Sequence, residues 1–449
     1  MENAGLITLI PTIVVLATAI LTNRPVAALI TGVVVGILLV SPENLLGSFS
    51  DITLSVMQDP QIAWIIMVCG LMGSLFYLLI ATGGVAAFTD TMTKKANTRN
   101  KSLIITWLLG LTMFLDDYLN AIVIGNSMKK VTDKFKVSRS MLAYIVDSTA
   151  APTCVLIPIS TWAVYFSVIL ESTDAIPLGG GMSHYIAAIP FMFYPIIALF
   201  LVPFVATGRF PLIGPMLNEE LIASQKDCTE KPPEDMQQKN PKQKANMWAF
   251  ILPLIVLIAF TWLNDIDLLK GIIAALMLTV PIIIGLKLIN MYAALDAMLE
   301  GFKIMIPPLM IVIAAFMFKT INDQLGFPQF IMESVRPFMS PILFPVIVFI
   351  SMAFMSFATA SNWGIFAIAI PIVMPLGVAL EVPIPLIIGA LLSAGSFGSH
   401  ACFYTDATVL SAQSCDISPM KHALTQFPYA LIAAGSASIF YIAIAYVVV

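Results

Sequence analysis

One stretch of the chain decides how the rest is interpreted. Residues 114–152 read FLDDYLNAIVIGNSMKKVTDKFKVSRSMLAYIVDSTAAP. An acidic, amide-bearing centre at Asp116–Asn120 interrupts an apolar run, and a second polar run at Asp147–Thr149 precedes Pro152. A charge in a bilayer core costs at least about 2.5–3.5 kcal/mol, so intramembrane acids usually serve binding or transport. The stretch therefore predicts broken membrane helices that carry a polar site.

The composition supports a membrane protein. Of 449 residues, 59% are hydrophobic and 11% charged, whereas soluble domains carry about 25% charged residues. Apolar runs of about 20 residues, the length of a spanning helix, recur along the chain. We therefore predict an all-α polytopic protein of the cell (inner or plasma) membrane. The expected segments are 6–22, 25–40, 61–82, 102–128, 140–170, 184–207, 247–263, 268–287, 304–321, 340–378, 384–412 and 424–449.

The placement of lysine and arginine predicts the topology. Basic residues are dense at 94–101, 129–139 and 208–246, and the positive-inside rule expects all three connections in the cytoplasm. The first two connections flank segment 102–128, which must then enter and leave the membrane by the same face. Each half of that segment has about 13 residues, about 20 Å as a helix, too short for a hydrocarbon core of about 30 Å. We therefore expect a re-entrant hairpin.

The connections on the other side have the opposite character. Residues 41–60 and 171–183 contain acids but no lysine or arginine. The same charge rule places these two connections away from the cytoplasm.

The second half of the chain has a matching pattern. Segment 340–378 is broken at Thr359–Asn362, and a second small-residue run, Ser393–His400, follows about 30 residues later, as Asp147–Thr149 follows Asp116–Asn120. Two inverted-topology repeats with re-entrant hairpins and broken helices are typical of secondary transporters. We expect membrane halves at 1–207 and 247–449. The polar stretch 208–246 is predicted to be a flexible cytoplasmic linker.

The acids of the first break carry the chemistry that we expect. Asp116 and Asp117 lie four and three residues from Asn120, so either pair would share one helix face. Carboxylate, amide and unwound carbonyl oxygens suit a hard cation such as sodium. Burial and a neighbouring acid both raise the pKa of a carboxylate, so sodium and proton would compete for one site. Competition together with alternating access suffices for antiport.

Other polar residues of the broken segments complete the candidate site. Two alternatives remain: an Asp can cap a half-helix, and small residues such as Ser361 and Asn362 can simply pack helices. We expect no cofactor, no nucleic acid and no metal site beyond transported sodium at Asp116, Asp117 and Asp147. The further candidate ligands are Ser148, Thr149, Ser361, Asn362, Ser396, Ser399, His400 and Asp406.

Two regions carry a family resemblance. Residues 114–152, and the C-terminal stretches GSHACFYTDATVLSAQSCD (398–416) and HALTQFPYAL (422–431), resemble the NhaC-type sodium/proton antiporter family, within the broad ion-transporter group. The resemblance implies two inverted repeats with paired hairpins, and exchange of sodium for protons or of organic substrates coupled to these ions. Relatives are linked to malate/lactate exchange and amino-acid uptake.

The resemblance also assigns motif positions. The family's acidic motif falls on Asp116, Asp117 and Asn120, and its second motif on 147–149. Many members carry an Asp before the C-terminal His, where this chain has Ser399. That departure bears on which substrate and how many ions are bound.

The sequence features favour a transporter over a channel or an enzyme. A sodium/proton antiporter leads, and a sodium- or proton-coupled transporter of a small carboxylate or amino acid is the alternative. No arginine lies in a predicted broken segment to clamp a carboxylate, which favours the cation. A channel could use the same hairpins as a filter. No P-loop or catalytic motif indicates an enzyme, and a homodimer is expected only by analogy with such folds.

Overall fold

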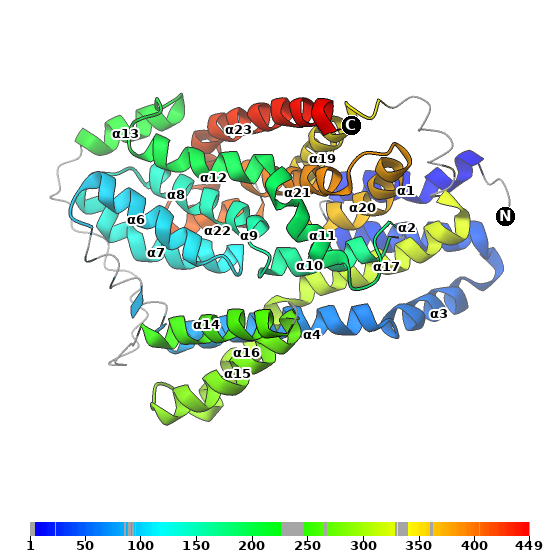
Figure 1. The fold of residues 1–449 in the computed structure, drawn as a ribbon, viewed down its shortest axis with the longest axis horizontal. Helices are drawn as coiled ribbons and strands as arrows, with labels where there is room; N and C mark the ends of the chain where they lie inside the picture. Colours follow the sequence, from blue (N-terminus) through cyan, green and yellow to red (C-terminus); the bar gives the residue numbers. More distant parts are fainter. Residues whose placement is uncertain are drawn as a thin grey trace.

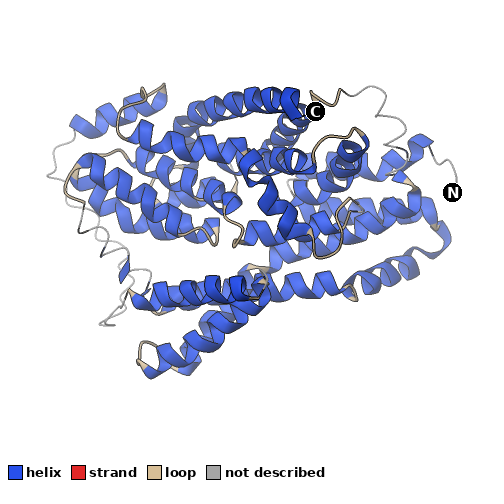
Figure 2. Ribbon diagram, in the orientation of Figure 1, coloured by secondary structure: helices blue, strands red, loops and turns tan. Residues whose placement is uncertain are grey.

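The structure is a computed structural model that describes residues 5–22, 24–84, 87–88, 91, 94, 96–173, 175–225, 247–264, 267–327, 330, 340–359, 362–403 and 405–448. Within these ranges the regular structure is entirely helical (Figure 2). Among the described residues, five helices are long and apolar enough to cross a membrane, or up to seven if each of two bent helix pairs forms one span. The fold is that of a polytopic helical protein.

One group of helices, here called the peripheral group, combines the beginnings of both halves of the chain. Within it, α4 packs along α16, α2 packs between α1 and α17, and α14 pairs with α15 (Figure 1). Its members from the first half are α1 (Leu9–Thr22), α2 (Pro25–Val40), α3 (Leu45–Met57) and α4 (Pro60–Ala81), with the 3-10 turns η1 (Gly5–Thr8) and η2 (Pro42–Asn44). Those from the second half are α14 (Trp248–Leu263), α15 (Leu268–Gly285), α16 (Met291–Ile304) and α17 (Ile306–Leu325).

The remaining helices form a core group, again with contributions from both halves. The first half supplies α6 (Arg99–Thr112), α7 (Asp117–Lys134), α8 (Arg139–Thr149), α9 (Ala151–Leu156), α10 (Thr161–Glu171), α11 (Gly181–Ala188), η3 (Ile189–Phe191) and α12 (Phe193–Ala206). The second half supplies α19 (Phe344–Thr359), α20 (Asn362–Ala379), α21 (Ile384–Ala401), α22 (Asp406–Ser414) and α23 (Pro419–Val448). Contacts of α21 with α9, α11 and α12, and of α22 with α7 and α8, join the halves.

The breaks in these helices have local causes. α8 ends at Thr149 because Ala150 leaves helical geometry (φ −80°, ψ −95°), and Pro152 lies in the first turn of α9. Ser160 then caps α10, with its hydroxyl accepting from the Ala163 amide at 3.1 Å. The two parts of this predicted segment meet at a bend of 42°. The side chains described in α21 are buried around the whole helix, as expected for a helix that is apolar on every side.

Three elements lie where no membrane segment was predicted. α3 occupies the connection 41–60. α16 carries Asp296, Glu300 and Lys303, and it precedes the predicted segment 304–321, with which it belongs to one candidate span, Met291–Leu325. α13 (Pro215–Gln225) begins the stretch 208–246, which was expected to be a flexible linker; residues 226–246 lie outside the described residues. A hydropathy pattern does not reveal such amphipathic or partly charged helices.

The described parts of the three basic connections lie at one end of the molecule, beside α6 and α13 at the left of Figure 1. Glu220 of α13 accepts from Arg99 Nη2 at 2.6 Å, at the start of α6. The same carboxylate accepts from the Ser138 amide (3.0 Å) and hydroxyl (2.7 Å), at the start of α8. α6 and α7 pack against each other, so the pair starts and finishes at one end, as a hairpin requires.

Candidate functional site

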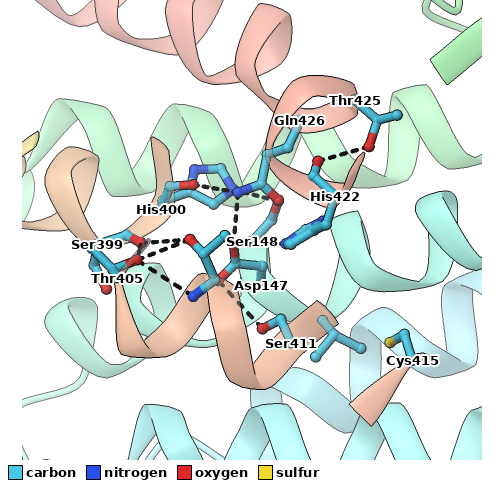
Figure 3. Close-up of polar contacts among 12 residues, drawn as sticks. Asp147, Ser148, Ser399, His400, Thr405, Ser411, Cys415, His422, Thr425 and Gln426 are labelled. Atoms are coloured by element: carbon cyan, nitrogen blue, oxygen red, sulfur yellow. Dashed lines mark hydrogen bonds and ion pairs between the residues drawn. The ribbon is translucent and has the colours of Figure 1, made fainter. Parts of the chain in front are cut away.

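Asp147 is the centre of a buried polar network (Figure 3). It lies in the last turn of α8 and is fully buried. Its Oδ2 lies 3.0 Å from His422 Nε2 and accepts from Gln426 Nε2 at 2.7 Å, both on α23. Its Oδ1 accepts from the Ser411 hydroxyl of α22 at 3.4 Å. The network therefore joins one helix of the first half to two helices of the second.

His400 extends this network to two further helices. His400 lies on α21. Its Nε2 lies 2.8 Å from the Ser148 hydroxyl, and its Nδ1 lies 2.6 Å from the Tyr194 hydroxyl of α12. Its backbone carbonyl accepts from the Gln426 side-chain amide, which also holds Asp147 (Figure 3). Both ring nitrogens thus have protein partners, which fix the orientation of the His400 ring within the network.

The break between α6 and α7 holds the second cluster. Asp116, Asp117 and Asn120 are all buried. Asn120 Nδ2 donates to the carbonyls of Gly110 and Thr149, each at 2.8 Å. The hairpin break is therefore bonded directly to the break of α8.

Close packing holds the two breaks together. A side chain at Gly110 would collide with the Thr149 hydroxyl, so α6 and α8 approach as closely as they do only because residue 110 lacks a Cβ. On the other side of the break, the Thr161 amide donates to the Leu115 carbonyl at 3.2 Å. The start of α10 is thereby fixed beside Asp116.

The two clusters concentrate negative charge. Asp116 and Asp147 both act electrostatically on Asp117, and the Trp162 side chain lies beside it. Buried carboxylates at adjoining breaks repel one another when all are ionised, and a bound cation or proton relieves the repulsion. The arrangement is suited to exchange one positive charge for another.

Several buried polar atoms have no hydrogen-bond partner within the described part of the chain. At the hairpin break these are Asp117 Oδ1 and Asn120 Oδ1; around the Asp147 network they are His422 Nδ1, Gln426 Oε1 and the hydroxyls of Ser396 and Ser399. Buried polar groups are almost always hydrogen-bonded. Orphaned oxygens beside carboxylates therefore mark a place for a ligand.

The other predicted ligands either form a hydrogen bond within their own segment or lie outside the described side chains. The Thr149 hydroxyl donates to Ile145 O at 2.8 Å, within its own helix, and it is the Thr149 carbonyl that bonds Asn120. Ser399 uses its carbonyl to accept from Thr405 Oγ1 at 2.9 Å. Asp406 starts α22 and Asn362 starts α20, but their side chains, like the whole of Ser361, lie outside the described residues.

Four residues of the network were not among the predicted site residues: His422, Gln426, Ser411 and Tyr194. His422 and Gln426 are four apart and share a helix face, and both lie in the 422–431 motif, so their spacing was an available signal. Tyr194 follows Phe193 in an apolar helix, and nothing in its sequence context distinguishes it from a packing aromatic.

Comparison with known proteins agrees with this architecture. Two solved structures share the fold. The YdaH transporter of Alcanivorax borkumensis has a TM-score of 0.61 and 11% sequence identity, and the match covers 89% of this chain and 86% of that one. MtrF of Neisseria gonorrhoeae, presented as illuminating a class of antimetabolite efflux pumps, has a TM-score of 0.56 and 12% identity, and the match covers 90% of this chain and 85% of that one.

Sequence comparison identifies relatives and a family. A protein of Haemophilus influenzae, described as uncharacterized, is 26% identical over 481 residues, covering 98% of this chain and 90% of the relative. The malate-2H(+)/Na(+)-lactate antiporter of Bacillus subtilis is 32% identical over 85 residues, which cover 19% of this chain and 18% of the relative. The model of the Na+/H+ antiporter family matches residues 178–446. With more than half of its length matched by that model, the chain belongs to the Na+/H+ antiporter family, of the NhaC type.

Proposed function

We propose that the protein exchanges sodium for protons across the cell membrane by alternating access. Family membership makes it a multi-pass membrane transporter and not an enzyme. The observation that carries the proposal is the set of buried carboxylates at two adjoining helix breaks, with the orphaned oxygens Asp117 Oδ1 and Asn120 Oδ1 beside them.

The first turn of α7 supplies a cation site in this proposal. Asp117 and Asn120 are three residues apart, so their side chains share a face. Two side-chain oxygens and the carbonyls of an unwound break make an all-oxygen environment, which suits sodium. Asp116 and Asp147 add the negative charge that sodium or protons neutralise in turn.

We further propose that the two halves are inverted repeats with paired re-entrant hairpins, α6–α7 and α19–α20. Support comes from matching packing. α6 meets α8 where Gly110 faces Thr149, and α19 meets α21 where Gly398 faces the Ser356 hydroxyl so closely that a Cβ at residue 398 would collide with it. In each half, therefore, a hairpin helix crosses the following broken helix at a glycine. The linker 208–246 would then lie in the cytoplasm, between halves at 1–207 and 247–449.

Proteoliposomes with an acid interior test the exchange. External sodium should alkalinise the interior in proportion to its concentration, and potassium should not. Asp117→Asn and Asp147→Asn should abolish the response, whereas the matched control Asp51→Asn, an exposed acid on α3, should retain it. Full sodium-driven exchange in Asp116→Asn, Asp117→Asn and Asp147→Asn alike would exclude the proposed site.

A second candidate is a sodium- or proton-coupled transporter of a small carboxylate or amino acid. The local similarity to the malate-2H(+)/Na(+)-lactate antiporter favours it. In the same vesicles, a pH response that needs malate, lactate or an amino acid, and is absent with sodium alone, would select this function. A channel would show no saturable, gradient-driven counterflow. Crosslinking in membranes would test for the homodimer.

A further inference from the structure

A polar cavity of about 550 Å³ lies apart from the two helix breaks. It opens where the peripheral group meets the core group: α3 and α17 form one side, and the end of α10 with the following loop forms the other. Its polar wall includes Ser55, Asp59, Glu171, Thr173, Lys319 and Thr320.

The helix α10 connects this cavity to the candidate site, and its length sets the distance between the two. Its first residue, Thr161, is hydrogen-bonded to the Leu115 carbonyl beside Asp116, and its last residue, Glu171, lines the cavity. A helix of 11 residues is about 15 Å long. The cavity is therefore a separate place about 15 Å from the hairpin break.

The charges of the wall are of both signs. Asp59 and Glu171 come from the two connections that contain acids and no lysine or arginine, so the charge rule places the cavity on the non-cytoplasmic side. Lys319 of α17 contributes the positive charge and lies 3.4 Å from Asp323. Glu171 Oε1 accepts from the Gly181 amide at 2.7 Å, which fixes that carboxylate in position.

The hydroxyls of the wall are arranged as acceptors. Ser55, Thr173 and Thr320 each donate to a carbonyl of their own helix or turn, at 2.8, 2.7 and 3.0 Å. A hydroxyl that has used its proton in this way still offers lone pairs to a donor. Together with the two carboxylates, these groups suit a ligand with several N–H donors, such as an ammonium group.

We propose that this cavity binds a small zwitterion of the α-amino-acid type. Its ammonium group would be bound by Asp59 and Glu171 with the hydroxyl oxygens, and its carboxylate by Lys319. The wall offers charges of both signs, so a molecule that carries an ammonium group and a carboxylate can pair with each of them. The volume lies within the range of about 300–1,000 Å³ typical of small-ligand sites. The proposal does not rest on sodium/proton exchange.

Binding to the purified full-length protein in detergent tests this inference without an ion gradient. Isothermal titration with the common amino acids should identify at least one ligand. The best ligand is then compared with the amine that lacks its carboxylate and the acid that lacks its ammonium group. Each should bind at least about tenfold more weakly, because each loses a charge-assisted contact.

Variants locate the binding. Lys319→Gln and Asp59→Asn should each weaken it about tenfold or more, and Glu171→Gln should do so while keeping an acceptor for the Gly181 amide. Lys303→Gln on α16, which removes an exposed lysine paired with Glu300, is the matched control and should bind normally. Asp117→Asn should also bind normally, because its side chain belongs to the hairpin break.

Three results would overturn the proposal. The first is no amino-acid binding, or equal binding by the amine alone. The second is binding that survives Lys319→Gln but is lost in Asp117→Asn, which would assign it to the transport site. The third concerns the phosphoethanolamine headgroup, which carries the same pair of charges. If vesicles of phosphatidylethanolamine, but not of phosphatidylglycerol, abolish amino-acid binding, the cavity is a lipid site.

Discussion

Replacement of Gln426 by leucine tests whether the Asp147 network holds the core group together. Leucine keeps a similar volume but removes the amide that donates to both Asp147 Oδ2 and the His400 carbonyl. Interhelical polar bonds in membrane proteins contribute about 0.6 kcal/mol on average and about 1.7 at most. Two such bonds, with a buried carbonyl left unpaired, give an expected loss of about 1–3 kcal/mol in the free energy of unfolding.

Titration of the protein with SDS in mixed micelles measures that loss. The matched control is Thr425→Val, at a neighbouring buried position whose hydroxyl donates only to His422 O in its own helix, at 2.7 Å. It should lose less than about 0.6 kcal/mol. If Gln426→Leu is no more destabilising than Thr425→Val, the network does not hold α8, α21 and α23 together, and our reasoning about the site fails.

Three further predictions concern packing, the basic end and pH. Gly110→Val should sharply reduce the yield of folded protein in size-exclusion chromatography because its side chain would meet Thr149, whereas Gly435→Ala, with open space around it, should not. Glu220→Ala should cost about 2–3 kcal/mol in SDS titration, since it removes the partner of Arg99 and of Ser138, the N-cap residue of α8. Glu219→Gln, which affects the partly exposed pair with Lys421, should cost less than about 1 kcal/mol. Burial raises the pKa of Asp133 above 3.8 despite Arg139 and Lys129, and Asp416 adds to the rise. As pH rises, the Asp133 carboxyl therefore loses its proton at a lower pH in the unfolded chain than in the folded one, so the free energy of unfolding falls as pH rises above 3.8. Asp133→Asn should flatten this part of the stability–pH curve.

Much of the architecture was predictable because its causes are local. The carboxylates at Asp116 and Asp117 and the polar run before Pro152 interrupt apolar segments, and the helices do break there. The basic connections were expected on one face, and Glu220, in the third of them, bonds residues of the other two. Composition and periodicity report such features directly.

The partners of the site residues were not predictable in the same way. His422 meets Asp147 across 275 positions of sequence, and Tyr194 meets His400 across 206. Such pairs depend on how α12 and α23 pack around α8 and α21, which one sequence does not specify. The sequence can therefore identify a buried acid but not the group that satisfies it.

The geometry of α8 explains how the two clusters can be coupled. Three consecutive residues at its end face three different partners: Asp147 faces His422, Ser148 faces His400, and the carbonyl of Thr149 accepts from Asn120 of the hairpin. Neighbouring residues of one helical turn cannot move independently, because their backbone is shared. In the proposed exchange, a cation at the α7 break that displaced Asn120 would therefore act on the bonds of Asp147 and Ser148. Exchange between sodium and proton needs such a connection, because a transporter whose two ions did not affect each other's binding would leak both gradients.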